Sequence, residues 1–303
     1  MAHSPRPDPA MIGGVVRPSF ARLPQPETLF KERAHRFRTL AAEHDLKPYL
    51  LFLADLCEVQ HDVQTDLPPV ELPAVDDLSR AREFEMPPLD RSRFTPDAAS
   101  EATLNGLCSC ISVRALTPTA DAALRTVRNA DAAARGAMME SVLSDSIPVE
   151  AIAEHVFVAA ALQVHFARLA GQLDVKNIVA VADGVCPICG GPPASSLIVD
   201  WQGAGGARFC ACALCGTQWN YIRAKCCVCG STKDVTYQEI EGGPGTIKAE
   251  CCGECRTYVK VLHHQQDVLL DPIADDVASL RLDLLVRETG LRRGGVNPFL
   301  IGY

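Results

Sequence analysis

The feature that most constrains this chain is a pattern of cysteines that occurs twice. Four Cys-x-x-Cys pairs lie in one part of the chain: Cys186/Cys189, Cys212/Cys215, Cys226/Cys229 and Cys252/Cys255. The gap between the first and second pairs encloses 22 residues, as does the gap between the third and fourth, and the second set follows the first at an offset of forty residues. Gly190 and Thr217 recur at this offset as Gly230 and Thr257. Self-similarity at a fixed period indicates two copies of one structural unit.

Paired cysteines at this spacing are typical of metal sites. Two residues between cysteines allow a tight turn to direct both sulfurs at one ion, and two such turns close a tetrahedral site of four sulfurs. A single Cys-x-x-Cys is also typical of thiol redox proteins, but four pairs at a repeated spacing favour metal over redox chemistry or disulfides. We therefore predict two tetrahedral metal ions per chain, each bound by the four cysteines of its own module. Zinc and iron both accept four sulfurs, so the ligand set leaves the metal open.

Six further cysteines remain of the fourteen in the chain. Three lie among the predicted ligands: Cys210, Cys227 and Cys251. We predict that these are buried small side chains, with the alternative that a thiol beside a metal exchanges with it or senses oxidants. The other three lie in helical segments and are predicted to be core residues: Cys57, Cys108 and Cys110. The adjacent pair His263 and His264 is predicted to lie at the surface or in packing contacts, because eight cysteines already fill two sites.

The chain changes in character along its length. Residues 27–173 are rich in Ala and Leu at helical spacing, interrupted by a proline-rich stretch at 66–88 that predicts a loop or surface strap. After Gly184, glycines, cysteines and short β-prone runs predominate, with glycine-rich hairpin turns predicted in "GAGG" (203–206) and "GGPGT" (242–246). One last helix is predicted within 271–290. The adjacent Asp275 and Asp276 fall in the first turn of this helix, where the helix dipole favours acidic residues, so they need no catalytic role.

These segments predict an α+β multidomain fold. An α-helical domain spans 1–183, two tandem rubredoxin-like or zinc-ribbon modules span 184–223 and 224–264, and a C-terminal helix and tail span 265–303. Neither module, at about forty residues, has enough large apolar side chains to hold its fold without the ion. We refer to residues 184–223 and 224–264 as the first and second modules.

Composition and motifs exclude several function classes. The formal net charge is -8 and the pI is near 5.5, which gives no electrostatic reason to expect nucleic acid or an anionic membrane as partner. No signal sequence and no membrane-spanning apolar run is predicted, so we expect a cytoplasmic protein with reduced thiols. Phosphate-binding loops, dinucleotide fingerprints and nucleophile elbows are missing from the sequence, which argues against an enzyme. A nucleic-acid-binding zinc-ribbon protein and a rubredoxin-like electron-transfer protein remain as alternatives.

Several stretches resemble a known family. They are "CPICG", "CALCGTQW", "KCCVCG", "AECCGECRTYVKVL", "DPIADDVASLRLDLLV" and "GGVNPF", and over residues 186–299 they look like the formate dehydrogenase accessory proteins, the FdhE family. The resemblance implies an α-helical domain followed by two rubredoxin-like metal domains, with metal ligands at the eight cysteines above and iron as the favoured metal.

The resemblance also implies a function. Such proteins are needed to make active respiratory formate dehydrogenase, and they act on its catalytic subunit in the cytoplasm before export. We therefore expect a chaperone-like maturation factor, with contacts from the metal modules and from the cleft where they meet the helical body. Bound metal would hold side chains such as Trp219 and Tyr258 in place for this contact.

Overall fold

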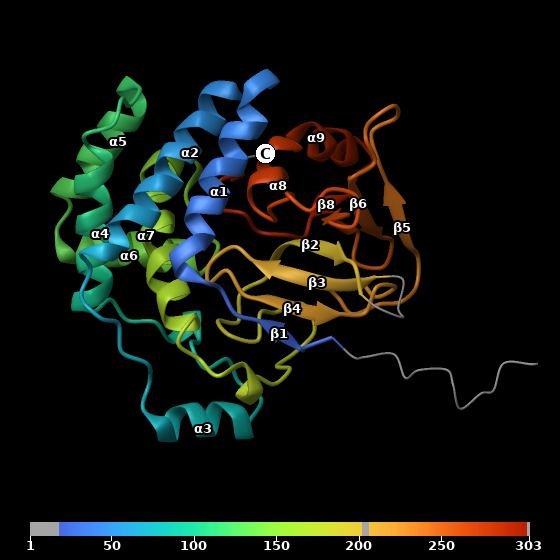
Figure 1. Cartoon of the computed structure of the whole chain (residues 1–303), viewed down its shortest axis with the longest axis horizontal. Helices are drawn as coiled ribbons and strands as arrows, with labels where there is room; N and C mark the ends of the chain where they lie inside the picture. The colour runs from blue at the N-terminus through green and yellow to red at the C-terminus, as the bar shows by residue number, and fades with distance from the viewer. Residues whose placement is uncertain (1–17, 202–205, 302–303) are drawn as a thin grey trace, which may run out of the picture.

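The computed structural model describes residues 18–201 and 206–301, and it places a body of helices beside one β-sheet (Figure 1). The helices of the body are α1 (Pro26–Leu40), α2 (Lys47–Asp62), α3 (Val75–Glu83), α4 (Ala98–Ile111), α5 (Pro118–Asn129), α6 (Ala132–Leu143) and α7 (Ile152–Ala170). The strands are β1 (Ala21–Arg22), β2 (Pro193–Val199), β3 (Ala207–Cys212), β4 (Gln218–Tyr221), β5 (Val235–Gln238), β6 (Ile247–Cys252), β7 (Thr257–Leu262) and β8 (Arg292–Arg293). Two helices, α8 (Ala274–Ala278) and α9 (Leu280–Glu288), lie between β7 and β8. The predicted α+β class is confirmed.

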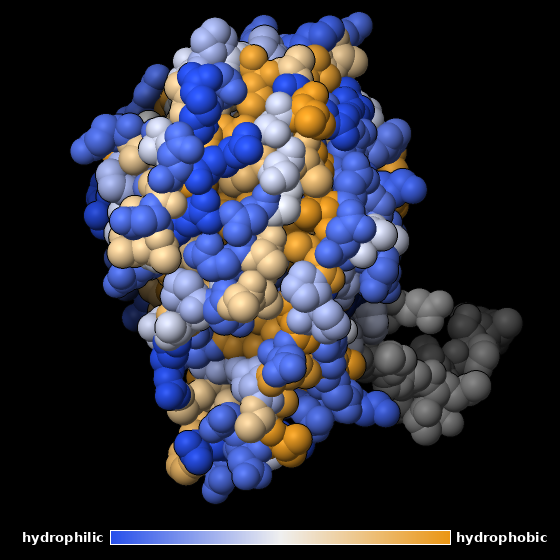
Figure 2. Space-filling model, turned by 90° about the vertical axis from the view of Figure 1, so that its left-hand side faces the viewer, coloured by the Kyte–Doolittle hydropathy of each residue, from blue (hydrophilic) through white to orange (hydrophobic). Residues whose placement is uncertain are grey.

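Helix α7 is the centre of the helical body. From His155 to Ala167 every residue is buried, because α2, α4, α5 and α6 pack around it. Length and composition alone would let the segment Val149–Ala170 cross a membrane, but 67% of its most apolar window is buried inside the protein. A largely apolar helix that other helices cover is a core helix of the fold. Figure 2 shows the outer helical side covered mainly by hydrophilic residues, with hydrophobic residues visible in a band between them.

The proline-rich stretch and the last helix differ from the predictions. Residues 66–88 contain the nine-residue helix α3, because the prolines of this stretch precede and follow residues 75–83 rather than interrupt them. The single helix predicted within 271–290 is two helices that meet at Ser279, whose backbone is not helical. Its hydroxyl donates to the Asp275 carbonyl at 2.7 Å, a local bond by which serine competes with regular helix geometry.

The two modules share one sheet. The strand order is β1-β4-β3-β2-β7-β6-β5, with β8 beside β7. Strands β2, β3 and β4 form the first module and β5, β6 and β7 the second, and a parallel pairing of β2 with β7 joins them through Ser196–Val261 and Leu197–Leu262. The predicted turn near Gly242 connects β5 to β6, whereas the other predicted turn, at 203–206, lies largely outside the described residues.

One apolar core runs from the helical body into the first module. It includes Phe157 and Leu162 of α7 together with Ile188, Ala213 and Trp219 of the module. The second module contributes Cys227 and Val259 to this core and has a smaller apolar cluster of its own under α9. The first module is therefore built into the body of the protein, while the second is attached mainly through the sheet.

A buried network of charges ties the second module to the C-terminal segment. Lys260 of β7 has a fully buried side chain and lies 3.3 Å from Asp276, and it also pairs with Asp283. Arg293 pairs with the same two carboxylates. Although burial alone would raise it, the pKa of Asp276 is lowered because Arg293 and Lys260 stabilise the ionised form. The helix dipole alone therefore does not account for the acidic residue at position 276. The same holds for position 275, because the Asp275 carboxylate binds Arg36 of α1 at 2.7 Å.

The buried network makes Lys260 a sensitive position. Replacing it by Met keeps the approximate volume but leaves Asp276 and Asp283 with only one cation. Removal of one partner from a buried ion pair costs about 3–5 kcal/mol, so we expect Lys260→Met to lower the free energy of unfolding by an amount in this range. The matched control is Lys248→Met on β6, since the Lys248–Glu239 pair is partly exposed and such pairs contribute about 0–1 kcal/mol. Denaturant unfolding of both variants tests this, and equal losses would contradict the role given to the network.

Candidate metal centres

Each candidate centre is built from two tight turns at matching positions of the repeat. In the first module, the Cys186 amide bonds to the Gly191 carbonyl at 2.7 Å and the Gly190 amide to the Cys186 carbonyl at 2.9 Å. In the second, the Cys226 amide bonds to Ser231 and the Gly230 amide to Cys226, at 2.8 and 3.0 Å. Gly190 and Gly230 have φ values of 75° and 74°, a left-handed conformation that glycine adopts without strain. The sequence repeat is therefore a repeat of backbone geometry.

The second turn of each module also repeats, with one change of residue. Gly216 of the first module has a φ of 73°, and Arg256, forty residues later, has a φ of 54°. The Thr217 hydroxyl lies 3.3 Å from the Cys215 sulfur, and the Thr257 hydroxyl lies 3.0 Å from the Cys255 sulfur. A hydroxyl at this distance can donate to a metal-bound thiolate and so orient the ligand from outside the coordination shell. The threonines, visible in the sequence only as a repeated letter, thus have a place in both centres.

The eight predicted cysteines come together as two groups of four. The groups are Cys186, Cys189, Cys212 and Cys215, and Cys226, Cys229, Cys252 and Cys255, and within each group all four sulfurs lie within 4.8 Å of one another. All fourteen cysteines of the chain are free thiols. The sulfur pairs that join the two turns of a group are 3.4 and 3.6 Å apart in the first group and 3.8 Å apart in the second.

This spacing fits a tetrahedral metal ion. Sulfurs placed about 2.3 Å from a central zinc ion at tetrahedral angles are about 3.8 Å from each other. Burial raises the pKa of the Cys186 thiol well above its usual value, so a buried group of thiolates requires a cation to offset its charge. Four soft sulfur donors suit zinc or iron. Both groups could therefore hold a tetrahedral metal ion.

The two centres differ in their surroundings. All four sulfur-bearing residues of the first centre are buried, whereas Cys229 of the second is exposed and Cys255 is partly exposed. The first centre is covered on one side by the segment before α4, where the Leu89 amide bonds to the Ile188 carbonyl at 2.9 Å and the Arg91 amide to the Cys189 carbonyl at 3.0 Å.

Helix α7 supports the first centre from the other side. Gln163 donates from Nε2 to the Ala213 carbonyl at 2.9 Å, inside the turn between Cys212 and Cys215. Gln60 of α2 donates in turn to the side-chain oxygen of Gln163 at 2.9 Å. Sequence reasoning missed both residues. The available signal is a glutamine within a strongly apolar helix, since a buried amide requires hydrogen-bond partners.

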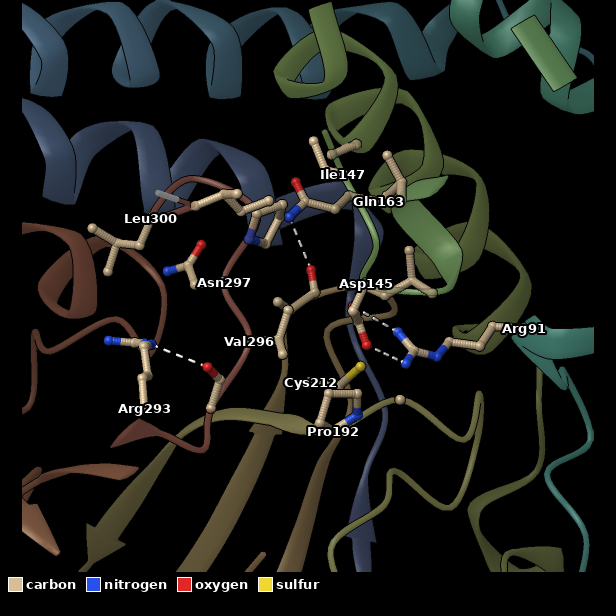
Figure 3. Close-up of a pocket in the computed structure, with 18 residues that line it drawn as sticks. Arg91, Asp145, Ile147, Gln163, Pro192, Cys212, Arg293, Val296, Asn297 and Leu300 are labelled. Atoms are coloured by element: carbon tan, nitrogen blue, oxygen red, sulfur yellow. Dashed lines mark hydrogen bonds and ion pairs between the residues drawn. The ribbon is translucent and has the colours of Figure 1, made fainter. Parts of the chain in front are cut away.

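A cavity of about 250 Å³ lies beside Cys212, between the helical body, the first module and the C-terminal tail (Figure 3). Its wall carries an ion pair between Arg91 and Asp145, with Nη1 and Oδ1 3.1 Å apart. Burial alone would lower the pKa of Arg91, but Asp145 and the thiolates of Cys189 and Cys212 raise it. Arg91 therefore supplies positive charge close to the first centre, and it too is a residue that sequence reasoning missed.

Other sequence predictions are settled by burial. Cys57 and Cys108 lie in the core as predicted, and Cys110 is partly buried. The adjacent His263 and His264 are partly buried and belong to neither four-sulfur group. Trp219 and Tyr258, predicted to contact a partner, are 3% and 1% exposed. That prediction is wrong, because both rings pack inside the protein.

The unequal exposure predicts an order of metal loss. We expect a chelator to remove the ion of the second centre first, because solvent reaches Cys229 and Cys255, whereas the sulfurs of the first centre become accessible only when the module separates from α7. Metal content measured over time should fall from two ions per chain to one and remain there for an extended period.

Variants at matching positions identify the centres. Cys229→Ser should lose one ion and keep the helical body folded, whereas Cys189→Ser should lose one ion and disrupt the packing of the first module on α7. Helix content by circular dichroism and metal content by mass spectrometry distinguish the two variants.

In the chelator experiment, loss of both ions at one rate, or earlier loss from the first centre, would contradict the assignment.

Comparison with known proteins covers nearly the whole chain. Family models described as FdhE N-terminal, FdhE central domain and FdhE C-terminal domain match residues 18–183, 185–223 and 224–300. A "Protein FdhE homolog" of Rhizobium meliloti is 42% identical over 306 residues, covering 100% of both chains. One of Stutzerimonas stutzeri is 35% identical, covering 94% of this chain and 93% of the relative.

A solved structure gives the same result. The crystal structure of the FdhE protein from Pseudomonas aeruginosa matches with a TM-score of 0.85 and 30% sequence identity, covering 93% of this chain and 99% of that one. The resemblance noted in the cysteine-rich region thus extends through the helical body, which family models and relatives also match. This chain belongs to the FdhE family.

Proposed function

We propose that this protein is a chaperone-like maturation factor that binds the catalytic subunit of formate dehydrogenase in the cytoplasm and keeps it competent for assembly. Membership of the FdhE family supports a role in the formation of formate dehydrogenase. The observation that carries the binding role is the closure of both centres by four cysteines. A catalytic metal site keeps a coordination position for substrate, whereas four protein sulfurs leave none.

We propose the eight cysteines of the two groups as metal ligands and iron as the metal of both centres. Four thiolates in tetrahedral arrangement suit iron as well as zinc, and the family resemblance favours iron. Protein purified without oxygen should contain about two iron ions per chain and show visible absorption from sulfur-to-iron charge transfer. A colourless protein with zinc in both centres would refute the choice of iron but not the ligand assignment.

We propose that the client docks in a groove between α1 and the sheet. This α1–sheet groove has a volume of about 840 Å³. Its apolar lining includes Leu197 and Val199 of β2, and at its edge the adjacent Val268 and Leu269 are 70% and 65% exposed. These side chains extend the apolar lining of the groove, and a contiguous apolar surface rimmed by polar residues is what marks a protein-binding site.

The groove also contains cationic side chains within an acidic protein. Its lining includes four Lys/Arg side chains and two Asp/Glu side chains: Arg22, Lys31, Arg33, Arg36, Glu32 and Asp271. Arg33 and Arg36 form ion pairs with nearby aspartates, whereas Arg22 stacks on the Phe209 ring at 4.0 Å and burial lowers its pKa. Lys31 is exposed. A client segment with apolar and acidic side chains would complement this surface.

A deletion strain tests the function. A strain lacking this gene should lose respiratory formate oxidation and regain it with the wild-type gene, and the purified protein should retain the catalytic subunit in a pull-down. Normal formate oxidation in the deletion strain together with no retained subunit would overturn the proposed function.

Variants of the groove test the docking surface separately. We expect Lys31→Glu combined with Leu269→Ser to weaken binding of the catalytic subunit about tenfold or more, since both a charge and an apolar contact are lost. The matched control is Lys176→Glu with Val113→Ser, which makes the same kinds of change at exposed positions outside the groove. Equal binding by the two double variants would move the docking surface elsewhere while leaving the function intact.

A further inference from the structure

Three cysteines of the metal-binding region belong to neither four-sulfur group: Cys210, Cys227 and Cys251. All three are buried, as predicted for small core side chains. Cys251 lies in the apolar cluster under α9, and its thiol points to the Ala249 carbonyl at 3.6 Å. Cys210 and Cys227 differ from Cys251 because each has the other as a neighbour.

Cys210 and Cys227 lie where the first module contacts the second, a region called the seam below. Cys210 is on β3 of the first module and Cys227 follows the proposed ligand Cys226 in the second. Their side chains are nonetheless neighbours beside the Arg208 guanidinium, which lies 3.4 Å from the Cys227 sulfur. Their exposed fractions are 0% and 1%. Since neither sulfur is a member of a four-sulfur group, both remain free to react when the two centres hold their ions.

Arg208 fixes the position of this pair. Its guanidinium makes two bonds to Glu250 of β6, at 2.8 and 2.9 Å, and lies 3.4 Å from the Cys227 sulfur. A third bond, at 3.1 Å, joins it to the Lys225 carbonyl. Because a guanidinium held at two oxygens is planar and has little rotational freedom, Arg208 locks β3 of one module against the first turn of the other. The two cysteines are therefore neighbours in a rigid, buried environment.

We propose that Cys210 and Cys227 form a redox-active dithiol that closes to a disulfide across the seam between the modules. Hydrogen peroxide is the class of oxidant small enough to reach a buried pair after local opening. One sulfur attacks the peroxide oxygen, which gives a sulfenic acid and one water molecule. The other thiol attacks the sulfenic sulfur, which forms the S–S bond and releases a second water molecule. The two thiols lose two electrons and two protons, and one peroxide becomes two water molecules.

The bond would act on the arrangement of the modules. Cys210 and Cys227 belong to different modules, so a disulfide would fix the sheet seam covalently where it is now held by hydrogen bonds and Arg208. Cytosolic disulfides are mostly transient and serve catalysis or redox sensing. Oxidising conditions in the cell would therefore restrict the movement of one module relative to the other, and the proposed metal ligands would be unchanged.

The test uses full-length protein with zinc in both centres, because zinc has no redox chemistry of its own. After exposure to hydrogen peroxide, we expect two thiols fewer per chain in a thiol titration under denaturing conditions with a metal chelator present. Peptide mapping without reductant should show Cys210 linked to Cys227. The metal content of the oxidised protein before denaturation should be unchanged, and dithiothreitol should restore both thiols.

Matched variants make the result specific. Cys210→Ala and Cys251→Ala each remove one buried, non-ligating thiol from a strand of the sheet. Cys251→Ala should oxidise like the wild type, whereas Cys210→Ala should form no linked peptide, and Cys227→Ser provides a second variant of the pair. Free Cys210 and Cys227 after oxidation, their linkage to other cysteines, or a disulfide that forms only after zinc is lost would each overturn the proposal.

Discussion

A short parallel ladder between β2 and β7 is the contact on which the rest of the C-terminal half depends. Ser196–Val261 and Leu197–Leu262 are its registered pairs, and β2 is buried along its whole length. Parallel neighbours require a long crossover connection, and here that connection contains β3, β4, β5 and β6. The ladder turns two small ribbons, each too small for an independent core, into the halves of one sheet. The buried pair between Arg208 of β3 and Glu250 of β6 is one contact between the joined halves.

The same ligand pattern produces two centres with different physical properties. The sulfur spacing and the supporting Thr217 and Thr257 are nearly equal in both modules. The difference arises outside the repeat, because α7 and the segment before α4 cover only the first centre. Gln163, reaching the turn after Cys212 from a buried helix, has no counterpart at the second centre among the hydrogen bonds of the described residues. The environment of a centre therefore depends on where its module packs and not on its motif.

The sequence was sufficient for features that depend on residues close together in the chain. The Cys-x-x-Cys turns and the apolar helix α7 follow from local spacing and composition. Features that depend on distant residues were not predictable from one sequence. Asp275 has the same first-turn signature whether or not Arg36, far away in the chain, lies beside it. The break at Ser279 was also missed, since serine within a helical pattern carries only a weak signal for a boundary.

The ion pairs that join α1 to Asp271 and to Asp275 of α8 give the proposed docking groove a fixed width. Arg33 binds Asp271 at 3.2 Å and Arg36 binds Asp275 at 2.7 Å, so one wall of the groove is tied to the base of the C-terminal helices. The opposite wall is β2 and β3, and Cys212 at the end of β3 belongs to the buried first centre. A groove whose walls are both held before binding loses little conformational entropy when a partner enters it. Metal in the first centre would thus contribute to partner binding at a distance, by keeping the end of β3 in place rather than by touching the partner.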